Sequence, residues 1–290
     1  MRLISYENNG QPAIGVVKSA GATEFVDLGA AGFALSTDMT ALVATAGGLA
    51  AAQAAADKAP ASAVKPLAGV RYLPLVPRPP KIICVGLNYA DHAKEGGHAR
   101  PEHPSFFMRG ATSQVGHQQP IIRPKASTKL DYEAELAVVI GKHARHLTSA
   151  NALDCVAGYS CYNDGSIRDF QRRGNQWTLG KNFDGTGAFG PALVTPDELP
   201  AGCAGLRIQS RLNGTVMQDS NTEHFLWNVV EVLVIISECM TLEPGDVIIT
   251  GTPAGVGYAR TPPVWMAPGD VCEIEVEGVG ILSNPIADEQ

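Results

Sequence analysis

Two glutamates, two residues apart, stand at the start of an apolar segment, LDYEAELAVVIG, at residues 130–141. The segment becomes β-branched and ends in glycine, which is typical of a β-strand. Because side chains alternate along a strand, Glu133 and Glu135 share one face with Ala137 and Val139. Both faces become apolar downstream, so we expect a strand buried on both sides. Two carboxylates in such a strand are costly to desolvate unless they are paired or bound to a metal.

The spacing of this pair suits metal binding. The Cα atoms of Glu133 and Glu135 should lie about 6.6 Å apart on one face, within reach of a single hard cation. Two solvated glutamates on an edge strand would have the same spacing. The segment CEIEVEG at residues 272–278 offers a comparison, because its glutamates oppose Ile274 and Val276 as in an ordinary surface strand. We interpret that segment as surface and the first pair as buried.

A third carboxylate, Asp164, ends the predicted strand VAGYSCYND at residues 156–164. The sequence Asn163-Asp164-Gly165 is also typical of a turn with no further role. As a metal ligand, Asp164 would complete a triad with three negative charges. Such a triad suits Mg²⁺ or Mn²⁺ and leaves coordination positions for water and substrate oxygens. The residues alone leave both interpretations open.

A histidine and a glutamate stand three residues apart in the predicted helix NYADHAKE at residues 88–95. His92 and Glu95 would be neighbours on one helical turn. A carboxylate beside a histidine orients the ring and raises its basicity, which is the arrangement of a base that activates water. The alternative is a surface ion pair of the glutamate with Lys94 or Arg100.

Two glycine-rich segments hold further candidates. Lys181 in GKNFDGTGAFGP is either an ordinary surface lysine or a group that approaches a substrate carboxylate or a developing enolate. The segment GTPAGVG at residues 251–257 lacks the GK[ST] ending of a P-loop and the GxGxxG order of a dinucleotide site, so we exclude nucleotide binding. It is either a plain turn or a place where backbone N–H groups and Thr252 face an anion.

The bulk composition limits the class of protein. The chain has 290 residues, a net charge of −7 and 45% hydrophobic residues, so it can bury a sizeable core. We expect no nucleic-acid partner, because no basic run occurs. We expect no membrane span, because Glu231 and Glu238 interrupt the apolar run near the C-terminal half. Six cysteines without a CxxC pair, and an N-terminus unlike a signal peptide, indicate a cytoplasmic protein with reduced thiols.

The pattern of elements predicts a β-rich α+β protein. Short strands are expected within residues 1–27 and an alanine-rich helix over residues 36–58, capped by Ser36 or Asp38. The proline-rich stretch at residues 73–80 predicts a boundary. We therefore divide the chain into a small N-terminal domain and a larger catalytic domain. The two domains span residues 1–75 and 76–290.

Strands, turns and one long helix are expected beyond this boundary. The apolar runs at 81–86, 246–251 and 270–282 predict strands. Asn213-Gly214 is a strong signal for a β-hairpin. The longest helix is expected to begin after a cap at Asn221 or Thr222. Many strands and few helices favour α+β over an alternating βαβ fold.

Between Lys81 and Pro285, several motifs in series resemble the fumarylacetoacetate hydrolase superfamily. In chain order these motifs are ICVGLNYADHAKE, PSFFMRG, DYEAELAVVIGK, GYSCYNDGSIRDFQ, GKNFDG, RLNGTVMQDSNT and GDVIITGTPAGVG. The resemblance implies a mixed β-sheet roll, a homodimer and a divalent metal on an acidic triad. The residues before the boundary resemble the variable extra domain of many bacterial members. Residues 1–75 could either cover the pocket or extend the dimer, and the sequence does not decide between these roles.

The resemblance also implies the roles of particular residues. The implied metal ligands are Glu133, Glu135 and Asp164, the implied catalytic residues are His92, Glu95 and Lys181, and the implied substrate contacts include Gln171 and Thr252. Val85 stands where the fumarylacetoacetate enzymes contribute a fourth carboxylate, so the chain resembles the acylpyruvase-like branch more closely. Arg109 stands where many members have lysine. There we expect it to clamp a substrate carboxylate with two hydrogen bonds.

From this resemblance we expect a Mg²⁺- or Mn²⁺-dependent hydrolase. It would cleave a C–C bond of a small 2,4-dioxo acid, of the acylpyruvate or fumarylpyruvate type, into pyruvate and a second acid. One alternative is an isomerase or decarboxylase of a 2-oxo or 2-hydroxydienoic diacid, such as oxaloacetate or 2-hydroxyhepta-2,4-diene-1,7-dioate. Others are a hydrolase of a sugar-derived 2,4-dioxo-3-deoxy acid, or a catalytically silent binding protein.

Overall fold

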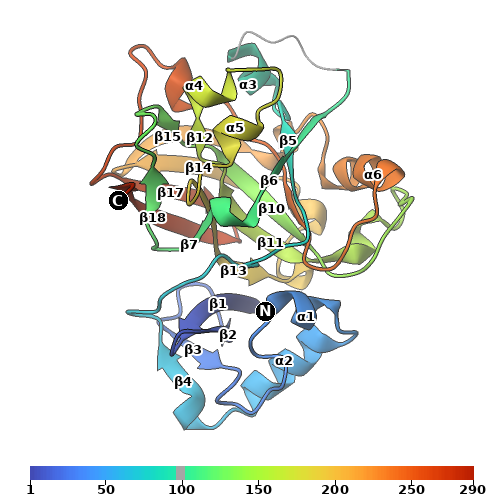
Figure 1. The fold of residues 1–290 in the computed structure, drawn as a ribbon. Helices are drawn as coiled ribbons and strands as arrows, with labels where there is room; N and C mark the ends of the chain where they lie inside the picture. Colours follow the sequence, from blue (N-terminus) through green and yellow to red (C-terminus); the bar gives the residue numbers. More distant parts are fainter. Residues whose placement is uncertain (96–101) are drawn as a thin grey trace.

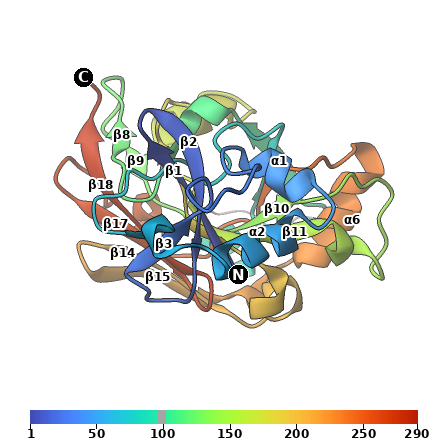
Figure 2. The same cartoon turned by 90° about the horizontal axis from the view of Figure 1, so that it is seen from below.

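The structure, a computed structural model, describes residues 1–95 and 102–290. Figure 1 shows a smaller body made by the N-terminal residues beneath a larger body made by the rest. The view from below in Figure 2 shows the N-terminal strands and helices in front of the larger body. Arg100, one alternative ion-pair partner of Glu95, lies outside the described residues, as does the side chain of Lys94.

An eleven-stranded mixed sheet runs through both bodies in the order β4-β3-β2-β1-β13-β11-β10-β16-β5-β6, and β7 also pairs with β13. Its N-terminal strands are β1 Arg2–Asn8, β2 Gln11–Val17, β3 Glu24–Asp27 and β4 Val64–Pro66. Its other strands are β5 Ile82–Gly86, β6 Ser105–Arg109, β7 Gln114–Gly116, β10 Ala134–Ile140, β11 Val156–Asn163, β13 Gly187–Val194 and β16 Val247–Ile249. Most neighbours are antiparallel, whereas β7–β13 and β5–β16 are parallel.

Two further sheets complete the strands. A five-stranded sheet has the order β15-β14-β17-β18-β8, and β9 pairs with β12. These strands are β8 Ile121–Arg123, β9 Leu130–Asp131, β12 Ser166–Ile167, β14 Arg207–Leu212, β15 Thr215–Asn221, β17 Val271–Val276 and β18 Gly280–Asp288. The predicted hairpin at Asn213-Gly214 joins β14 to β15, and both turn residues have positive φ. The predicted surface strand is β17, whose Glu273 and Glu275 pair with Arg211 at the surface.

The helices are short. They are α1 Met39–Ala44, α2 Gly48–Asp57, α3 Ala90–Glu95, α4 Arg168–Gln171, α5 Thr178–Lys181 and α6 Val229–Cys239. Single 3-10 turns are formed by Ala61–Ala63, Ala111–Ser113, Ala152–Cys155, Pro196–Glu198, Ala201–Cys203, Thr222–His224 and Gly257–Ala259.

Two helix predictions differ from the structure at their ends. The expected helix over residues 36–58 is two helices, because Gly47 adopts a left-handed φ of 73° between them; Asp38 caps the first. The longest helix begins at Val229 and not near Thr222. Asn228 and Glu231 form a capping box there, whereas Asn221 caps only a 3-10 turn.

The two faces of β10 pack into two different cores, which confirms the prediction of a strand buried on both sides. Leu136 and Val138 belong to the core between the main sheet, the five-stranded sheet and α6. Ala137 and Val139 belong to the core shared with the N-terminal residues. In Figure 2, the five-stranded sheet lies to the left of β10 and β11 and α6 lies to their right; both contribute to the core that contains Leu136 and Val138. The fold is therefore the predicted β-rich α+β type.

The N-terminal strands continue the main sheet. Arg2 and Leu3 of β1 pair with Val194 and Leu193 of β13. The shared core also includes residues from both sides of the predicted boundary, among them Leu42 and Ile249. The two predicted domains are thus joined by backbone pairing and by a common core.

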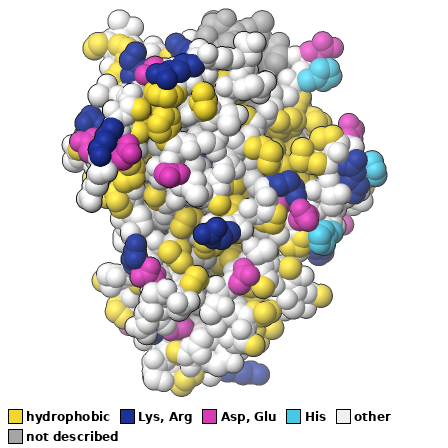
Figure 3. Space-filling view, viewed as in Figure 1, with side chains coloured by type: hydrophobic (Ala, Val, Ile, Leu, Met, Phe, Trp, Pro, Cys, Tyr) yellow, Lys and Arg dark blue, Asp and Glu magenta, His cyan; other side chains and the backbone are white. Residues whose placement is uncertain are grey.

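The surface gives limited evidence about partners. On the face in Figure 3, acidic and basic side chains lie next to each other, and neither sign dominates a large region. Among the described residues, no helix is long and apolar enough to cross a membrane. All six cysteines have free thiols.

Candidate active site

The pairing of β10 with β11 brings the three candidate metal ligands together. Ala134 pairs with Asn163, so Glu133 and Asp164 stand opposite each other, one residue beyond that pair. The Asp164 amide donates to the carbonyl of Glu133 at 3.0 Å. The Asn163 side chain accepts from the Glu133 amide, also at 3.0 Å. Because opposed residues share a face, Asp164 lies beside both glutamates.

The resulting cluster could hold a metal ion. One carboxylate oxygen from each of Glu133, Glu135 and Asp164 lies within 4.8 Å of the others, and all three residues are buried. Three carboxylates converging in a buried place are the donor set that Mg²⁺ and Mn²⁺ prefer.

Two of these carboxylates are paired with buried cations. The Lys181 Nζ lies 2.6 Å from both Glu133 Oε2 and Asp164 Oδ2. The other oxygen of Glu133 lies 2.8 Å from Arg168 Nη2. The other oxygen of Asp164 lies 2.5 Å from Arg109 Nη1. Each carboxylate oxygen retains a second lone pair, so these contacts do not use up the acceptor capacity of the triad.

Glu135 differs from the other two, because its carboxylate has no ion-pair partner among the described residues. Within residues 1–95 and 102–290, its side chain accepts one hydrogen bond, from the Gly251 amide to Oε2 at 2.5 Å. Gly251 has a φ of +95°, and a Cβ there would lie 2.7 Å from the Asn88 Cβ. This close turn is therefore suited to glycine. An uncompensated buried carboxylate is the feature that fits a bound cation best.

The pKa shifts of the buried groups agree with a cation site at the triad. Burial, followed by the charges of Asp164 and Glu133, raises the pKa of Glu135 well above its ordinary value. Burial also acts on Glu133, but the charges of Lys181 and Arg168 hold its pKa below the ordinary value. Burial opposes the charged form of Lys181, yet Asp164 and Glu133 raise its pKa, so the lysine stays protonated. A divalent cation would stabilise the ionised form of Glu135.

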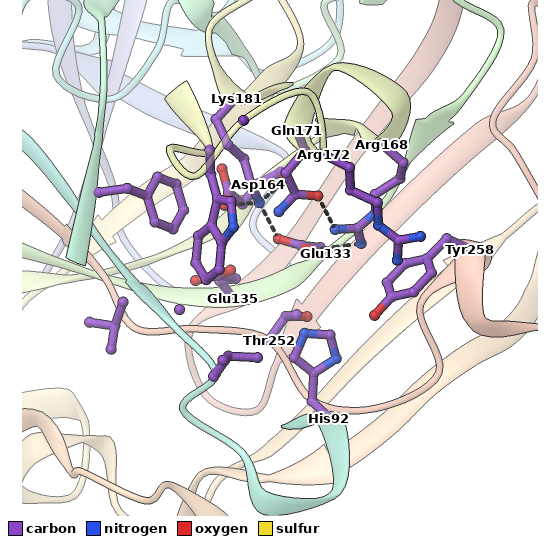
Figure 4. A pocket seen from close by; sticks show the side chains of 16 residues that line it. His92, Glu133, Glu135, Asp164, Arg168, Gln171, Arg172, Lys181, Thr252 and Tyr258 are labelled. Carbon is purple, nitrogen blue, oxygen red and sulfur yellow. Dashed lines mark hydrogen bonds and ion pairs between the residues drawn. The ribbon is translucent and has the colours of Figure 1, made fainter. Parts of the chain in front are cut away.

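The cluster lies in the wall of a cavity of about 280 Å³ (Figure 4). This volume is near the lower end of the roughly 300–1,000 Å³ usual for small-molecule sites, which suits a small metabolite. Besides the three acids, the polar and aromatic side chains of the wall are those of His92, Phe107, Arg168, Gln171, Arg172, Trp177, Lys181, Thr252 and Tyr258.

The predicted histidine–glutamate pair lies at this cavity, but the two side chains are not hydrogen-bonded. His92 lines the cavity and is 8% exposed. Its Nδ1 is buried without a hydrogen bond among the described residues and lies 3.6 Å from Glu95 Oε2. Both oxygens of Glu95 instead accept from the Gly255 amide, at 3.0 and 3.1 Å. The imidazole therefore faces the cavity without a fixed partner.

Arg109 does not line the cavity, contrary to the expectation that it clamps a substrate. Its side chain is fully buried behind Asp164. It also donates to Ser113 Oγ at 3.1 Å and to Thr186 Oγ1 at 3.0 Å. A Cβ at Gly187 would lie 2.7 Å from its Nη2, so the packing is tight. With its N–H groups engaged by protein atoms, Arg109 neutralises Asp164 from behind.

The two other predicted substrate contacts do line the cavity. Gln171 accepts from Arg168 Nη1 at 2.9 Å, which fixes its amide at the end of α4. Thr252 is 3% exposed, and its hydroxyl accepts from Gln218 Nε2 at 2.8 Å. Both are therefore held in position by neighbouring side chains.

Several residues at the site are not among the sequence predictions, notably Asp131, Arg168, Arg172 and Tyr258. Arg168, Gln171 and Arg172 follow Asp164 at positions i, i+3 and i+4, which share one face of a helix. This rule would have placed Arg168, Gln171 and Arg172 together, and all three line the cavity. Tyr258 follows the glycine-rich segment, and no local pattern indicates that it faces the cavity.

Asp131 is the fixed point of this part of the site. Its Oδ2 accepts from Arg168 Nε at 2.7 Å and from the Tyr258 amide at 3.1 Å. Its Oδ1 accepts from the amides of Gly257 at 2.7 Å and Tyr132 at 2.9 Å. One buried carboxylate thus ties Arg168 to the loop that carries Tyr258.

Comparisons with known proteins identify the family of the chain. Residues 81–287 match the model of the fumarylacetoacetate (FAA) hydrolase C-terminal family. A mitochondrial oxaloacetate tautomerase of Bos taurus is 44% identical over 225 residues, which are 77% of this chain and 71% of that protein. The fumarylacetoacetate hydrolase of Exiguobacterium antarcticum is 36% identical with a TM-score of 0.84, and all of both chains is covered.

A third relative is an isomerase. The 2-hydroxyhepta-2,4-diene-1,7-dioate isomerase of Mycobacterium marinum is 30% identical with a TM-score of 0.77, covering 100% of this chain and 99% of that one. The relatives therefore include a hydrolase, an isomerase and a tautomerase. The family match from residue 81 to residue 287, together with these likenesses, shows that the chain belongs to the fumarylacetoacetate hydrolase family.

Proposed function

We propose that this protein is a divalent-metal-dependent tautomerase or isomerase of a small 2-oxo dicarboxylic acid, with oxaloacetate as the first substrate to test. The observation that carries the proposal is the meeting of a buried acid triad with Lys181, Arg168 and Arg172 around one small cavity. A metal-capable cluster beside cationic side chains suits an anionic oxo acid. The 44% identity to an oxaloacetate tautomerase supports the choice of reaction.

A tautomerase needs only a proton transfer. A proton leaves C3 of the oxo acid, the C–H electron pair becomes the C2=C3 double bond, and the C2 oxygen gains a proton. A bound Mg²⁺ or Mn²⁺, held by Glu133, Glu135 and Asp164, would polarise the 2-oxo group and offset negative charge on its oxygen. Lys181 is protonated and points into the cavity, where its charge would stabilise an enolate oxygen.

His92 is the candidate for the proton transfer at C3. Its ring lies in the cavity wall, on the side away from Lys181 (Figure 4). Because the ring lines the cavity and no hydrogen bond to a described residue holds its Nδ1, it could exchange a proton with a molecule bound there. Gln171 and Thr252, both fixed by neighbouring side chains, would orient the acid.

The second candidate is the C–C bond hydrolase expected from the sequence. His92 and Glu95 are 3.6 Å apart, close enough to form a water-activating pair after a small shift. The likeness to a fumarylacetoacetate hydrolase supports this candidate. We rank it second because Glu95 is engaged by the Gly255 amide and does not orient His92 in this arrangement.

The test is NMR of product formation from oxaloacetate, 2-hydroxyhepta-2,4-diene-1,7-dioate, acetylpyruvate and fumarylpyruvate, each with Mg²⁺, Mn²⁺ or EDTA. Metal-dependent acceleration of the enol–keto exchange of oxaloacetate, or of the shift of the dienedioate double bond, supports the proposal. Metal-dependent release of pyruvate plus a second acid from an acylpyruvate assigns the hydrolase. Release of CO₂ from oxaloacetate assigns a decarboxylase. Absence of any metal-dependent change in these substrates contradicts the proposal.

We also propose that the protein is a homodimer. β6 is the edge strand of the main sheet, and its Phe106 and Met108 are 38% and 46% exposed. Leu179 of the adjacent α5 is 62% exposed. An apolar edge of this kind is usually covered by another chain. Light scattering after gel filtration should give twice the chain mass, and Met108→Glu should lower it to one chain mass.

A further inference from the structure

Arg172 and Arg168 lie against the same tyrosine at the cavity. The Arg172 guanidinium carbon is 4.6 Å from the centre of the Tyr258 ring, and that of Arg168 is 4.5 Å from it. Figure 4 shows this group to one side of the acid triad, across from Lys181. A guanidinium that stacks on an aromatic ring through its face keeps its N–H edge available for hydrogen bonds.

The two arginines differ in what surrounds them. Arg168 is 4% exposed, and its nitrogens contact Asp131 at 2.7 Å, Gln171 at 2.9 Å and Glu133 at 2.8 Å. Its charge is therefore balanced by the protein. Arg172 is exposed, and no carboxylate of the described residues lies within ion-pair distance of it. Its side chain also makes no hydrogen bond to any described residue.

We propose that Arg172 determines specificity for dicarboxylates, by binding the second carboxylate of a substrate whose 2-oxo acid end faces Glu133, Glu135 and Asp164. This inference rests on the proposed function. A guanidinium fork binds a carboxylate through two parallel hydrogen bonds. Tyr258 holds the fork in place, which lowers the entropy lost when a ligand binds. A substrate with a methyl group in place of its second carboxylate would leave Arg172 without a partner.

The chain supplies a matched control for this position. Arg173 is the next residue and is also exposed, but its guanidinium lies 3.4 Å from the Phe170 ring centre and does not line the cavity. Removing either charge changes the net charge of the protein equally. A difference between the two variants therefore reports position and not long-range charge.

The experiment compares two ligands of equal length on the Mn²⁺-loaded protein. Calorimetry would measure the Kd of 2-oxoglutarate and of 2-oxopentanoate, which has a methyl group in place of the second carboxylate. We expect the unmodified protein to prefer the diacid by about tenfold or more, the range of one charged hydrogen-bonded contact. Arg172→Gln should remove this preference and leave the Kd of the monoacid within about twofold. Arg172→Lys should retain part of it, and Arg173→Gln all of it.

Several outcomes would overturn the inference. They are equal affinity of the unmodified protein for both ligands, a preference that survives Arg172→Gln, and equal losses in Arg172→Gln and Arg173→Gln. The result is separable from the proposed function, because binding is measured without turnover. If oxaloacetate is not tautomerised but Arg172→Gln abolishes the preference, the subsite stands and the proposed reaction fails. If tautomerisation occurs and the preference does not depend on Arg172, the proposed reaction stands and the subsite at Arg172 fails.

Discussion

Replacing Asp131 tests how the site is held together. Asp131 is fully buried and accepts four hydrogen bonds, one from Arg168 and three from backbone amides. Asp131→Ala would leave a buried guanidinium with one carboxylate in place of two. It would also leave the amides of Gly257 and Tyr258 without their acceptor, so the loop that carries Tyr258 would lose its attachment.

The size of the effect follows from these contacts. Removing one partner of a buried ion pair costs about 3–5 kcal/mol of unfolding free energy. Arg168 keeps its contact with Glu133 at 2.8 Å, so we expect a value near the lower end. For a chain of this size, about 3 kcal/mol lowers Tm by about 5 °C. Asp131→Asn keeps an acceptor oxygen but not the charge, and we expect an intermediate loss.

The assay is thermal unfolding by circular dichroism in the presence of EDTA, so that loss of a bound metal does not add to the result. Asp219→Ala is the control. Asp219 also pairs with an arginine, Arg207, at 2.6 Å, but the two side chains are 45% and 58% exposed. Exposed pairs contribute at most about 1 kcal/mol, so Tm should fall by at most about 2 °C. Similar shifts for Asp131→Ala and Asp219→Ala would refute the argument from burial.

Three further predictions concern the metal, the base and acid stability. Glu135→Gln should abolish stoichiometric Mn²⁺ binding in calorimetry, because Glu135 is the triad carboxylate without an ion-pair partner among the described residues; unchanged Mn²⁺ binding would remove it from the site. His92→Ala should retain Mn²⁺ and lose turnover by about 100-fold or more; an undiminished rate would exclude His92 from the chemistry. Burial lowers the pKa of His117 to about 4, from an ordinary value of about 6.5. The neutral Nδ1 of His117 accepts from the Ser283 amide at 3.1 Å. The contribution of the neutral ring to the free energy of unfolding is therefore complete above pH 6.5 and is lost as the pH falls toward 4. The loss is at most about 3 kcal/mol. Urea unfolding at pH 7 and pH 5 measures this effect. Between these two pH values, the free energy of unfolding should fall less for His117→Asn than for the unmodified protein, and equal falls would contradict the prediction.

The sequence predicted the parts of the site that depend on local alternation. Glu133 and Glu135 share a face with Ala137 and Val139, and that face is buried as expected. The register between β10 and β11 is a contact between segments far apart in the sequence, so spacing alone could not place Asp164 beside Glu133. Resemblance to the family supplied that step.

The errors have similar physical causes. Arg109 has the chemistry of a carboxylate clamp, but only the tertiary structure shows that its N–H groups are already engaged behind Asp164. The expected start of α6 lies too early in the sequence, since Phe225 and Trp227 extend the apolar pattern. The signal for the true start, Asn228 followed three residues later by Glu231, was present and local.

The balance of charge links the metal, the substrate and Arg172. Four buried carboxylates, those of Asp131, Glu133, Glu135 and Asp164, face three buried cations, Arg109, Arg168 and Lys181, so with all four carboxylates ionised the buried network carries one excess negative charge. A dianionic acid entering such a network alone would be repelled. One divalent cation would reverse the excess to one positive charge, and a dianion would then return it to one negative charge. Arg172 is the cavity residue whose charge no described carboxylate pairs, and it neutralises that remainder. A monocarboxylate would need only the divalent cation for neutrality, so an additional cation at the rim is expected where the substrate carries a second carboxylate.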